Sequence, residues 1–585
     1  PFAIDAAVRT VASLDERSTR WANVARQVCE AGRRGEAAST ILLERGRQCL
    51  SRRRDALAAA VDTLATADAA TVAAAADVVD RLEPSEPCSQ RDYLEVSVPP
   101  PPARLAAQVA ALRADLARVR SAMHAGHFTD ALRLAAAAVA ASAGADYPPL
   151  IAEARAALGR VELEHADYRA AIADLEEGYH AARGAALSEV ALLTAADAGY
   201  ATLAQGDLAG AALWLRFAEA ELTENPALAV FRRDYLAVRA SLDVAQGHHG
   251  AARAAAREAV ALARNDPGPD RARAIADALG NLATILGDSG DWAGSLATAQ
   301  ESLAANQQLY GADHPNLISS LQSIAHAQVR LQRHDEAEAA VARAERIARA
   351  AYPADSTNVA YALLNAAYLH AEKREYGRAA ELDRQALAIL EKAQGPRHPD
   401  VAIALADLAV AEGNQGKPAE ARAAHLRVLD IRRTIYGEHN AMVAVAYFNV
   451  GSTYVQEDRC AEAIPSLEAA AAIWETIDRD NVDAAFPLFD LGRCYVATDQ
   501  PRRAIAPLER AVALRAAQGV EHYRIALPML ALAEAHLDLG HRDEARALYA
   551  AARARLLRSD RPDMLDYVDA QVAEIERRGA SPRRK

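Results

Sequence analysis

The stretch ALLNAAYLHAEKREYGRAAELDRQALAIL, residues 362–390, decides the fold of this chain. Both halves place small or apolar side chains three or four positions apart, first Leu364, Ala367 and Tyr368 and then Ala379, Leu382 and Ala386. This spacing puts the side chains on one face of a helix, and two such facing stripes let antiparallel helices interdigitate. The polar segment 374–376 is the expected turn. The stretch therefore predicts one pair of packed helices.

The pair recurs along the chain at a nearly constant interval. A column of small residues, termed the marker column, repeats every 40–43 residues: Ala131, Ala171, Ala211, Ala252, Ser295, Ala337, Ala379, Ala421, Ala463, Ala504 and Ala545. A fixed period of this length indicates stacked helix pairs rather than one globular core. Hydrophobic residues make up 51% of the chain, without the sustained alternation typical of strands. We predict an all-α, right-handed superhelical solenoid of about eleven helix pairs.

Four regions are expected along the chain. Residues 1–82 form a helical hairpin, with helices over 4–30 and 40–82 and a break near residues 69–71. Residues 83–102 contain the run Pro99–Pro102 and form a linker, because proline cannot continue a helix. The repeat array covers residues 103–575, and residues 576–585 form a basic, disordered tail. The first residue is Pro1 rather than Met, so we expect the chain to be a fragment or a processed product.

The helix pairs resemble the tetratricopeptide repeat. That family pairs a Leu-Gly dipeptide in the first helix with a small residue in the second, and the dipeptide occurs at 158–159, 279–280 and 491–492. The period exceeds the usual 34 residues of the family. The connecting segments YGADHPN (310–316), QGPRHPD (394–400) and YGEHNAM (436–442) resemble those of the kinesin-light-chain type, which has longer helices. The resemblance implies a surface that binds proteins or extended peptides.

The N-terminal region carries a second resemblance. The segment CEAGRRGEAASTILLERGRQCLSRRRDAL, residues 29–57, followed by the linker and the repeats, resembles the C-terminal region of myxobacterial-type serine/threonine protein kinases. There a kinase domain and a membrane-spanning or linker segment precede the hairpin. The resemblance implies the sensor or partner-recruitment region of a bacterial signalling kinase whose catalytic domain is not in this chain. Whether the region is cytoplasmic or extracytoplasmic stays open.

Composition argues against several other functions. The net charge of −13 disfavours nucleic-acid binding, and no apolar run approaches the roughly 20 residues that span a bilayer. No cysteine pair has C-x-x-C spacing, and the loop histidines lie one or two repeats apart: His314, His398, His439 and His522. We therefore expect no metal site and no cofactor, and we interpret the histidines as caps of helix ends. Cys29 and Cys49 flank a glycine-containing break, and a disulfide between them is one option, whereas Cys460 and Cys494 are expected to pack as small apolar residues.

One tripeptide resembles part of a catalytic motif. His541-Arg542-Asp543 matches the start of a kinase catalytic loop, which also requires an Asn five residues after the Asp. Leu548 stands there, and the tripeptide falls where every repeat has its turn. We interpret it as a repeat turn and predict that the chain is not an enzyme.

A polar ladder lies fourteen residues before the markers of seven repeats: Asp197, Asn281, Ser323, Asn365, Asp407, Asn449 and Asp490. Asn and Asp are poor choices for the middle of a helix. Each side chain either clamps the backbone of an extended partner or bonds a neighbouring helix to hold the stack in register. In the kinesin-light-chain type the Asn equivalent to that of GNLATI (280–285), LNAAYL (364–369) and FNVGST (448–453) contacts bound peptide. The candidate peptide-binding residues are Asn281, Asn365, Asp407, Asn449 and Asp490.

The acidic members of this ladder, Asp407 and Asp490, favour a basic or amine-bearing partner. The leading hypothesis is a non-catalytic scaffold that binds a protein or peptide on a concave surface lined by the first helices. The alternatives are a stand-alone tetratricopeptide adaptor and a structural protein that assembles with itself. The sequence leaves the oligomeric state and the identity of the partner open.

Overall fold

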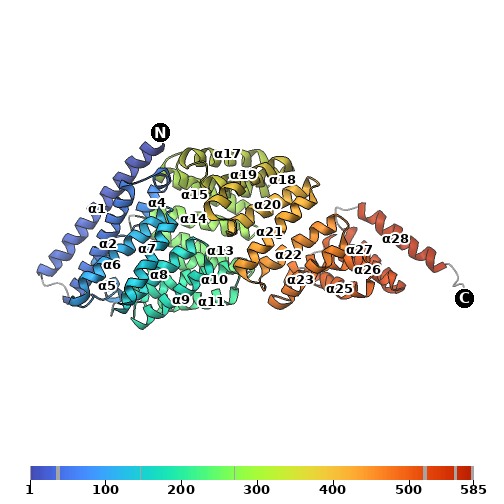
Figure 1. The fold of residues 1–585 in the computed structure, drawn as a ribbon, viewed down its shortest axis with the longest axis horizontal. Coiled ribbons are helices and arrows are strands. Elements are labelled where there is room, and N and C mark those ends of the chain that lie inside the picture. The colour runs from blue at the N-terminus through green and yellow to red at the C-terminus, as the bar shows by residue number, and fades with distance from the viewer. Residues whose placement is uncertain are drawn as a thin grey trace. The chain divides into compact units, whose positions relative to one another are not determined.

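The computed structural model describes residues 2–34, 40–144, 147–268, 270–517, 523–558 and 563–580 (Figure 1). Regular structure in these residues is helical, with no strand among them. The predicted fold class is confirmed, since the chain is an all-α repeat solenoid. It divides into two compact units, Pro1–Lys373 and Arg374–Lys585, and each unit is described by itself.

The helices of unit 1 are α1 (Phe2–Arg34), α2 (Thr40–Ala65), α3 (Ala69–Ala73), α4 (Ala75–Asp80), α5 (Arg91–Val96), α6 (Ala106–His124), α7 (Phe128–Ala143), α8 (Pro148–Glu164), α9 (Tyr168–Gly184), α10 (Ser188–Ala204), α11 (Leu208–Glu224), α12 (Arg232–Ala245), α13 (His249–Asn265), α14 (Arg271–Asp288), α15 (Trp292–Tyr310), α16 (Ile318–Arg330), α17 (His334–Ala351) and α18 (Thr357–Glu372). Short 3-10 helices lie at Glu86–Ser89, Ala103–Leu105, Pro226–Phe231 and Pro315–Leu317.

The helices of unit 2 are α19 (Tyr376–Gln394), α20 (Pro399–Asn414), α21 (Pro418–Tyr436), α22 (Ala441–Gln456), α23 (Cys460–Ile477), α24 (Ala485–Ala497), α25 (Pro501–Ala517), α26 (Tyr523–Asp538), α27 (Arg542–Leu556) and α28 (Asp563–Ala580). A 3-10 helix lies at Val482–Ala484. Helix α28 includes the first residues of the segment expected to be a tail, and residues 581–585 lie outside the described part.

Even-numbered helices from α6 to α26 are the first members of the pairs, termed helices A, and the odd-numbered helices that follow them are helices B. Within each unit every helix A packs on its helix B, as α8 does on α9 and α22 on α23. The marker residues lie on helices B and are only 0–4% exposed. Small side chains at these positions let the two helices approach closely, so the marker column is a packing feature.

The turn between the helices has the same backbone in all eleven repeats. The residue five positions before each marker has a positive φ, which favours glycine. Glycine stands there in six repeats, and other residues accept the same left-handed conformation in five: Ala166, Gln332, Arg374, Asp458 and Asp499, with φ of 57–61°. The turn geometry therefore persists where the sequence signal is lost.

The Leu-Gly dipeptide reflects a close contact between paired helices. A Cβ on Gly492 would lie 2.3 Å from Cγ of Leu508, and one on Gly159 would lie 2.6 Å from Cγ of Leu175. Gly280 differs, because its Cβ would meet only Ser302, at 3.6 Å. The dipeptide at 279–280 is thus three positions out of register with the other two, counted from the marker column.

The N-terminal region contains the two expected long helices, α1 and α2, which pack side by side (Figure 1). The second helix ends at Ala65, and Asp68 caps α3 by accepting a hydrogen bond from the backbone N–H of Thr71 at 2.8 Å. The break therefore comes slightly before the predicted position, at an Asp that is a good N-cap.

Residues 83–102 are more structured than the expected linker. They contain α5, and Cys88, Tyr93 and Leu94 are buried against α1 and α2. Cys88 is bonded to Cys49, with their Cα atoms 5.5 Å apart. The predicted Cys29–Cys49 option was wrong, because Cys49 faces this segment while Cys29 is exposed and free.

The other two cysteines are also bonded. Cys460, the first residue of α23, forms a disulfide with Cys494 of α24, with Cα atoms 4.8 Å apart. The expectation that they pack as separate apolar residues was wrong. The bond joins consecutive repeats, so the two positions meet only once the pairs are stacked.

Candidate functional site

The helices A lie on the inner side of the stack within each unit. Neighbouring helices A contact one another from α6 to α18 and from α22 to α26, as α12 does α14 and α22 does α24, whereas helices B do not approach each other to the same extent. In a curved stack the elements that come closest line the concave side. The ladder residues lie on this side, as the expected groove requires.

Several helices A leave a narrow strip of their surface exposed or half-buried, and this strip is termed the inner stripe. In α20 it consists of Ile403, Asp407, Val410 and Asn414, all of which are exposed, while most other residues of the helix are buried. The spacing of four, three and four residues is one face of a helix. The equivalent residues are Val445, Asn449, Ser452 and Gln456 in α22 and Phe486, Asp490, Arg493 and Ala497 in α24. The ladder position lies in the middle of each stripe.

In unit 1 the ladder residues have different environments. Asp197 of α10 accepts a hydrogen bond from Arg160 of α8 at 2.5 Å, which ties neighbouring helices A together. Asn365 donates to the backbone oxygen of Tyr361 one turn earlier, at 2.8 Å. Asn281 is exposed and has no side-chain hydrogen bond within the described residues. Asp197 thus fits the register interpretation, and Asn281 remains available to a ligand.

In unit 2 the ladder is acidic. Asp407 has no ion pair or hydrogen bond within the described residues, and desolvation raises the pKa of its carboxyl group to about 6. Desolvation also raises the pKa of Asp490 to about 6, although Arg493 lies 3.8 Å away and opposes the shift. Asn449 is half-buried between them in the ladder. The carboxylate of Asp407 is accessible at the surface but partly desolvated by the surrounding protein. A cationic group of a ligand would therefore interact favourably with it.

Two buried polar residues lie behind this surface. Asp383 of α19 is 1% exposed, and its Oδ1 has no hydrogen-bond partner in the described part of the chain. Burial, and then the charge of Asp407, raise its pKa to about 8. His425 of α21 is 6% exposed, and burial lowers its pKa to about 4.

The sequence analysis missed both residues, although the repeats contain a signal. Both stand four positions after a marker, where four other repeats carry leucine: Leu175, Leu215, Leu467 and Leu508. Comparing this column between the repeats would have singled out Asp383 and His425.

The N-terminal region covers part of the inner side of unit 1. Ser121 of α6 lies 2.7 Å from the hydroxyl of Thr63 in α2, and Glu153 of α8 lies 3.9 Å from Arg52. The same region reaches later repeats, where Tyr310 donates to Asp80 at 2.7 Å and Arg17 pairs with Asp270 at 3.0 Å. It therefore bridges the first repeats of unit 1 to those around α14 and α15.

On the inner side of unit 1, arginine side chains lie among carboxylates of the same chain. His124 of α6 has its pKa lowered to about 3 by burial and then by Arg81, Arg160, Arg120 and Arg273. Carboxylates lie among these arginines, and burial raises the pKa of three of them: Asp197, Asp234 and Asp277. The mixed charges select no class of ligand.

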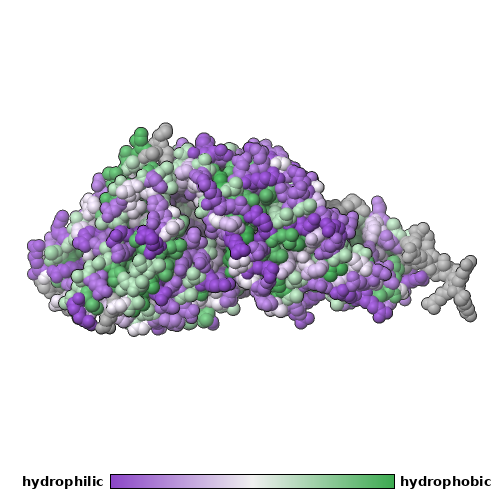
Figure 2. Space-filling model, in the orientation of Figure 1, coloured by the Kyte–Doolittle hydropathy of each residue, from purple (hydrophilic) through white to green (hydrophobic). Residues whose placement is uncertain are grey.

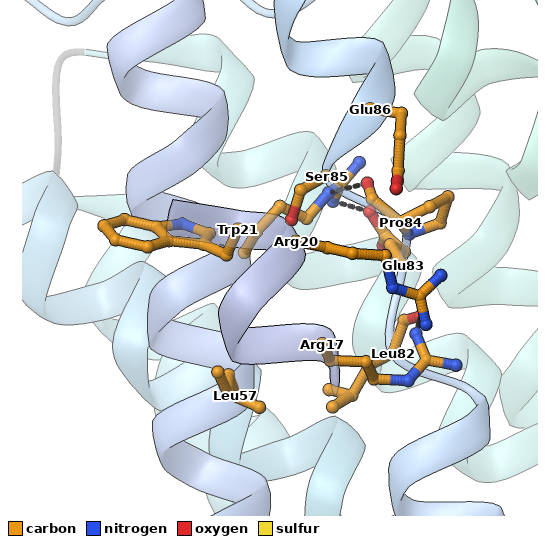
Figure 3. A pocket seen from close by; sticks show the side chains of 10 residues that line it. Arg17, Arg20, Trp21, Leu57, Leu82, Glu83, Pro84, Ser85 and Glu86 are labelled. Carbon is orange, nitrogen blue, oxygen red and sulfur yellow. Dashed lines mark hydrogen bonds and ion pairs between the residues drawn. The ribbon is translucent and has the colours of Figure 1, made fainter. Parts of the chain in front are cut away.

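A small cavity lies between α1, α2 and residues 82–86 (Figure 3). Arg17 and Arg20 extend toward the backbone of this segment, and Arg17 donates to the carbonyl oxygen of Leu82 at 2.8 Å. The cavity encloses about 20 Å³, which holds about one water molecule. It belongs to the packing of the N-terminal region.

The loop histidines have the expected role in two repeats. Nδ1 of His314 accepts from the N–H of Asn316, and Nδ1 of His398 accepts from that of Asp400, both at 3.2 Å. In the next repeat Asn440 is the cap instead of His439, and it accepts from the N–H of Met442 at 2.8 Å. His522 lies outside the described residues.

Other features bear on catalysis, metals and membranes. His541 is the N-cap residue of α27 and the two residues after it start that helix, so the His-Arg-Asp tripeptide is a repeat turn. Among the described residues no group of three His, Cys, Asp or Glu is placed to hold a metal ion. Within the same residues no helix combines the length and hydrophobicity needed to cross a membrane.

The surface in Figure 2 is mainly hydrophilic, with small separate hydrophobic patches. Hydrophobic surface is visible at the N-terminal end of α1, where Ile4, Val8 and Val11 are exposed. On unit 2 the exposed apolar side chains of the inner stripes are Ile403, Val410 and Phe486, at 50%, 52% and 37%. The inner stripes thus combine apolar contact area with polar groups.

These features define an all-α repeat solenoid with an accessible polar and apolar inner surface. The tetratricopeptide-repeat family profile matches residues 274–350, 358–434, 407–475 and 442–517, so the chain contains tetratricopeptide repeats. No curated protein matches the chain.

Several solved structures are similar to this chain. BtubC (BKLC) from P. vanneervenii is 23% identical, covering 38% of this chain and 91% of its own, with a TM-score of 0.35. A putative kinesin light chain from Podosopora anserina is 21% identical, covering 35% and 99%, with a TM-score of 0.33. A signal transduction ATPase with a tetratricopeptide repeat sensor from Pyrococcus horikoshii is 14% identical, covering 69% and 55%, with a TM-score of 0.45. Because these values are low, nothing about function follows from them.

Proposed function

We propose that the chain is a non-catalytic scaffold that binds an extended peptide segment of a partner protein on its inner stripes. Tetratricopeptide repeats are protein-interaction modules, and an accessible concave side suits an extended ligand. The observation that carries the proposal is the state of Asn281, Asp407 and Asn449. These three lie in the middle of their stripes without side-chain hydrogen bonds in the described part of the chain, Asn281 and Asp407 exposed and Asn449 half-buried.

The resemblance of residues 29–57 supports a finer proposal, that this scaffold recruits partners to a bacterial serine/threonine kinase. The compartment belongs to the same proposal. Two disulfides occur in the structure, and disulfides persist in oxidising environments, which favours an extracytoplasmic location. We expect the chain to co-purify with kinase activity from its native host and to be tethered to the membrane there.

Selection from a random twelve-residue peptide library tests the scaffold. Peptides enriched on the wild-type chain should lose binding to Asn449→Ala, because that change removes the amide donor and acceptor from the inner stripe. The matched control is Glu420→Gln on α21, an exposed residue at the start of a helix B. Thermal unfolding midpoints should be the same for all three proteins.

Two results would contradict the proposal. One is that no peptide is enriched on the full chain. The other is that the enriched peptides bind Asn449→Ala as tightly as wild type, which would place their site elsewhere. A lowered midpoint for Asn449→Ala would instead support the interpretation that the ladder holds the stack in register.

A further inference from the structure

The inner stripe of α20 differs from those beside it in the balance of its charges. In α24 the carboxylate of Asp490 has a cation from its own helix, Arg493, at 3.8 Å. In unit 1 Asp197 has Arg160 at 2.5 Å. Asp407 occupies the same ladder position and has no such partner within the described residues. In these two repeats an arginine thus pairs with the carboxylate of the ladder, whereas no such arginine pairs with Asp407 among the described residues.

The side chains around Asp407 suit the shape of a long basic residue. Ile403 and Val410 lie one turn before and after it on the same stripe, 50% and 52% exposed. A lysine or arginine side chain buries its methylene groups on apolar surface while its charged end reaches a polar group. Apolar surface that brackets an unpaired carboxylate provides both contacts.

A second observation, independent of the stripe, comes from the helix behind it. Asp383 of α19 is 1% exposed with an unpartnered Oδ1, and four other repeats place leucine at this position. A buried polar group without a partner is destabilising relative to leucine. Asp383 is close enough to Asp407 for the charge of one to raise the pKa of the other. A second carboxyl group therefore stands behind the exposed one.

We propose that Asp407, bracketed by Ile403 and Val410 and backed by Asp383, receives one lysine or arginine side chain of the bound peptide. This inference rests on the function proposed above and names the chemistry of the partner. A charge-assisted hydrogen bond to Asp407 satisfies the carboxylate that the fold leaves unpaired. The aliphatic stem of the ligand covers the two exposed apolar side chains.

Binding should depend on pH, because the peptide requires an ionised Asp407. Ionisation in the free protein is centred near pH 6, so affinity should fall about tenfold between pH 7.5 and pH 5. Asp383, with a pKa of about 8, and His425, with a pKa of about 4, are mainly uncharged across this range. Among the cations on the helices packed against α20 are Arg384 of α19, which pairs with Glu412 at 2.6 Å, and Arg432 of α21.

Four synthetic peptides test the proposal. Each has twelve residues of valine, leucine and threonine and a single central Lys, Arg, Gln or Glu, and fluorescence anisotropy measures its affinity for the full chain. The Lys and Arg peptides should bind about 10- to 100-fold more tightly than the Gln peptide. Asp407→Asn should abolish this preference and its pH dependence, while Glu420→Gln should retain both.

Two further variants sharpen the test. Asp383→Leu should unfold at a higher temperature than wild type, because it removes a buried carboxyl group without a partner, and it should keep the preference for Lys and Arg, because Asp407 is intact. Replacing residues 583–585 by glutamine should leave the affinity unchanged. A tenfold gain in that variant would show that the basic end of the chain occupies the site, and would overturn the proposal.

The outcomes distinguish a failure of this inference from a failure of the proposed peptide-binding function. If none of the four peptides binds and the library selection also fails, the scaffold itself is wrong. If all four bind equally, or if Asp407→Asn keeps the preference for Lys and Arg, peptide binding stands and the assignment of a basic ligand to Asp407 is wrong.

Discussion

Replacing Gly492 by alanine tests the packing that sets the repeat. The new Cβ would lie 2.3 Å from Cγ and 2.6 Å from Cδ2 of Leu508, whose side chain is fully buried. Cγ is the branch atom, so a rotation about the end of the side chain cannot relieve the contact. Overpacking costs about 1–3 kcal/mol, and we expect a cost near the upper end of this range. Alanine is about 1 kcal/mol more favourable than glycine in a helix, which offsets part of this cost. The net loss should be about 2 kcal/mol.

Hydrogen exchange of α24 and α25 in the full chain measures this effect locally. A loss of about 2 kcal/mol corresponds to roughly thirtyfold faster exchange of the protected amides. The control is Gly377→Ala in α19, where no atom lies within 4 Å of the added Cβ and exchange should not accelerate.

A double variant separates overpacking from other effects of the substitution. Leu508→Ala alone should cost about 2–5 kcal/mol, because it leaves a cavity. Combined with Gly492→Ala the cost should be smaller than the sum of the two, since the new methyl group enters the vacated space. If Gly492→Ala exchanges no faster than wild type, or if the two effects add, the contact is not the reason for glycine.

Three other changes have definite expected results. Gln332→Gly should stabilise the chain by about 1 kcal/mol in thermal unfolding, because φ is +61° at this turn residue. His425→Leu should be about 2 kcal/mol more stable than wild type at pH 5, since the unfolded chain takes up a proton below its pKa of about 6.5 while the folded histidine stays neutral down to about 4. That difference should shrink as the pH rises from 5 through 6.5, and a difference independent of pH would contradict it. Cys88→Ser opens a loop of 39 residues and should destabilise the N-terminal region by about 3–4 kcal/mol, with reduced wild type as the comparison in urea unfolding.

The repeat was predictable because its signals are local. A marker and its turn are five residues apart, and the facing stripes of one pair lie within about thirty residues. Where glycine is absent from the turn, as at Arg374, the spacing alone still predicted the fold, and the structure has the same left-handed residue there. The Leu-Gly dipeptide was less reliable, because Gly280 has the right residue type in the wrong register.

The candidate site was predictable only in part. The ladder position followed from counting back from the marker, but the state of each ladder residue depends on its neighbours in space. Asp197 is paired with Arg160 of a different repeat, whereas Asp407 is not paired within the described residues. The two residues have the same type and the same repeat position, so no local pattern distinguishes them.

The amino-acid sequence by itself determined the all-helical pairs, their period and the side of each pair that carries the ladder, because short-range spacing controls all three. Only the tertiary structure decided which cysteines meet, and it paired Cys49 with Cys88 rather than with Cys29. It also decided that the N-terminal region bridges repeats more than 200 residues away, through contacts such as Tyr310 with Asp80. The physical reason is that pairing, burial and pKa depend on groups brought together by stacking, which a periodic pattern does not specify.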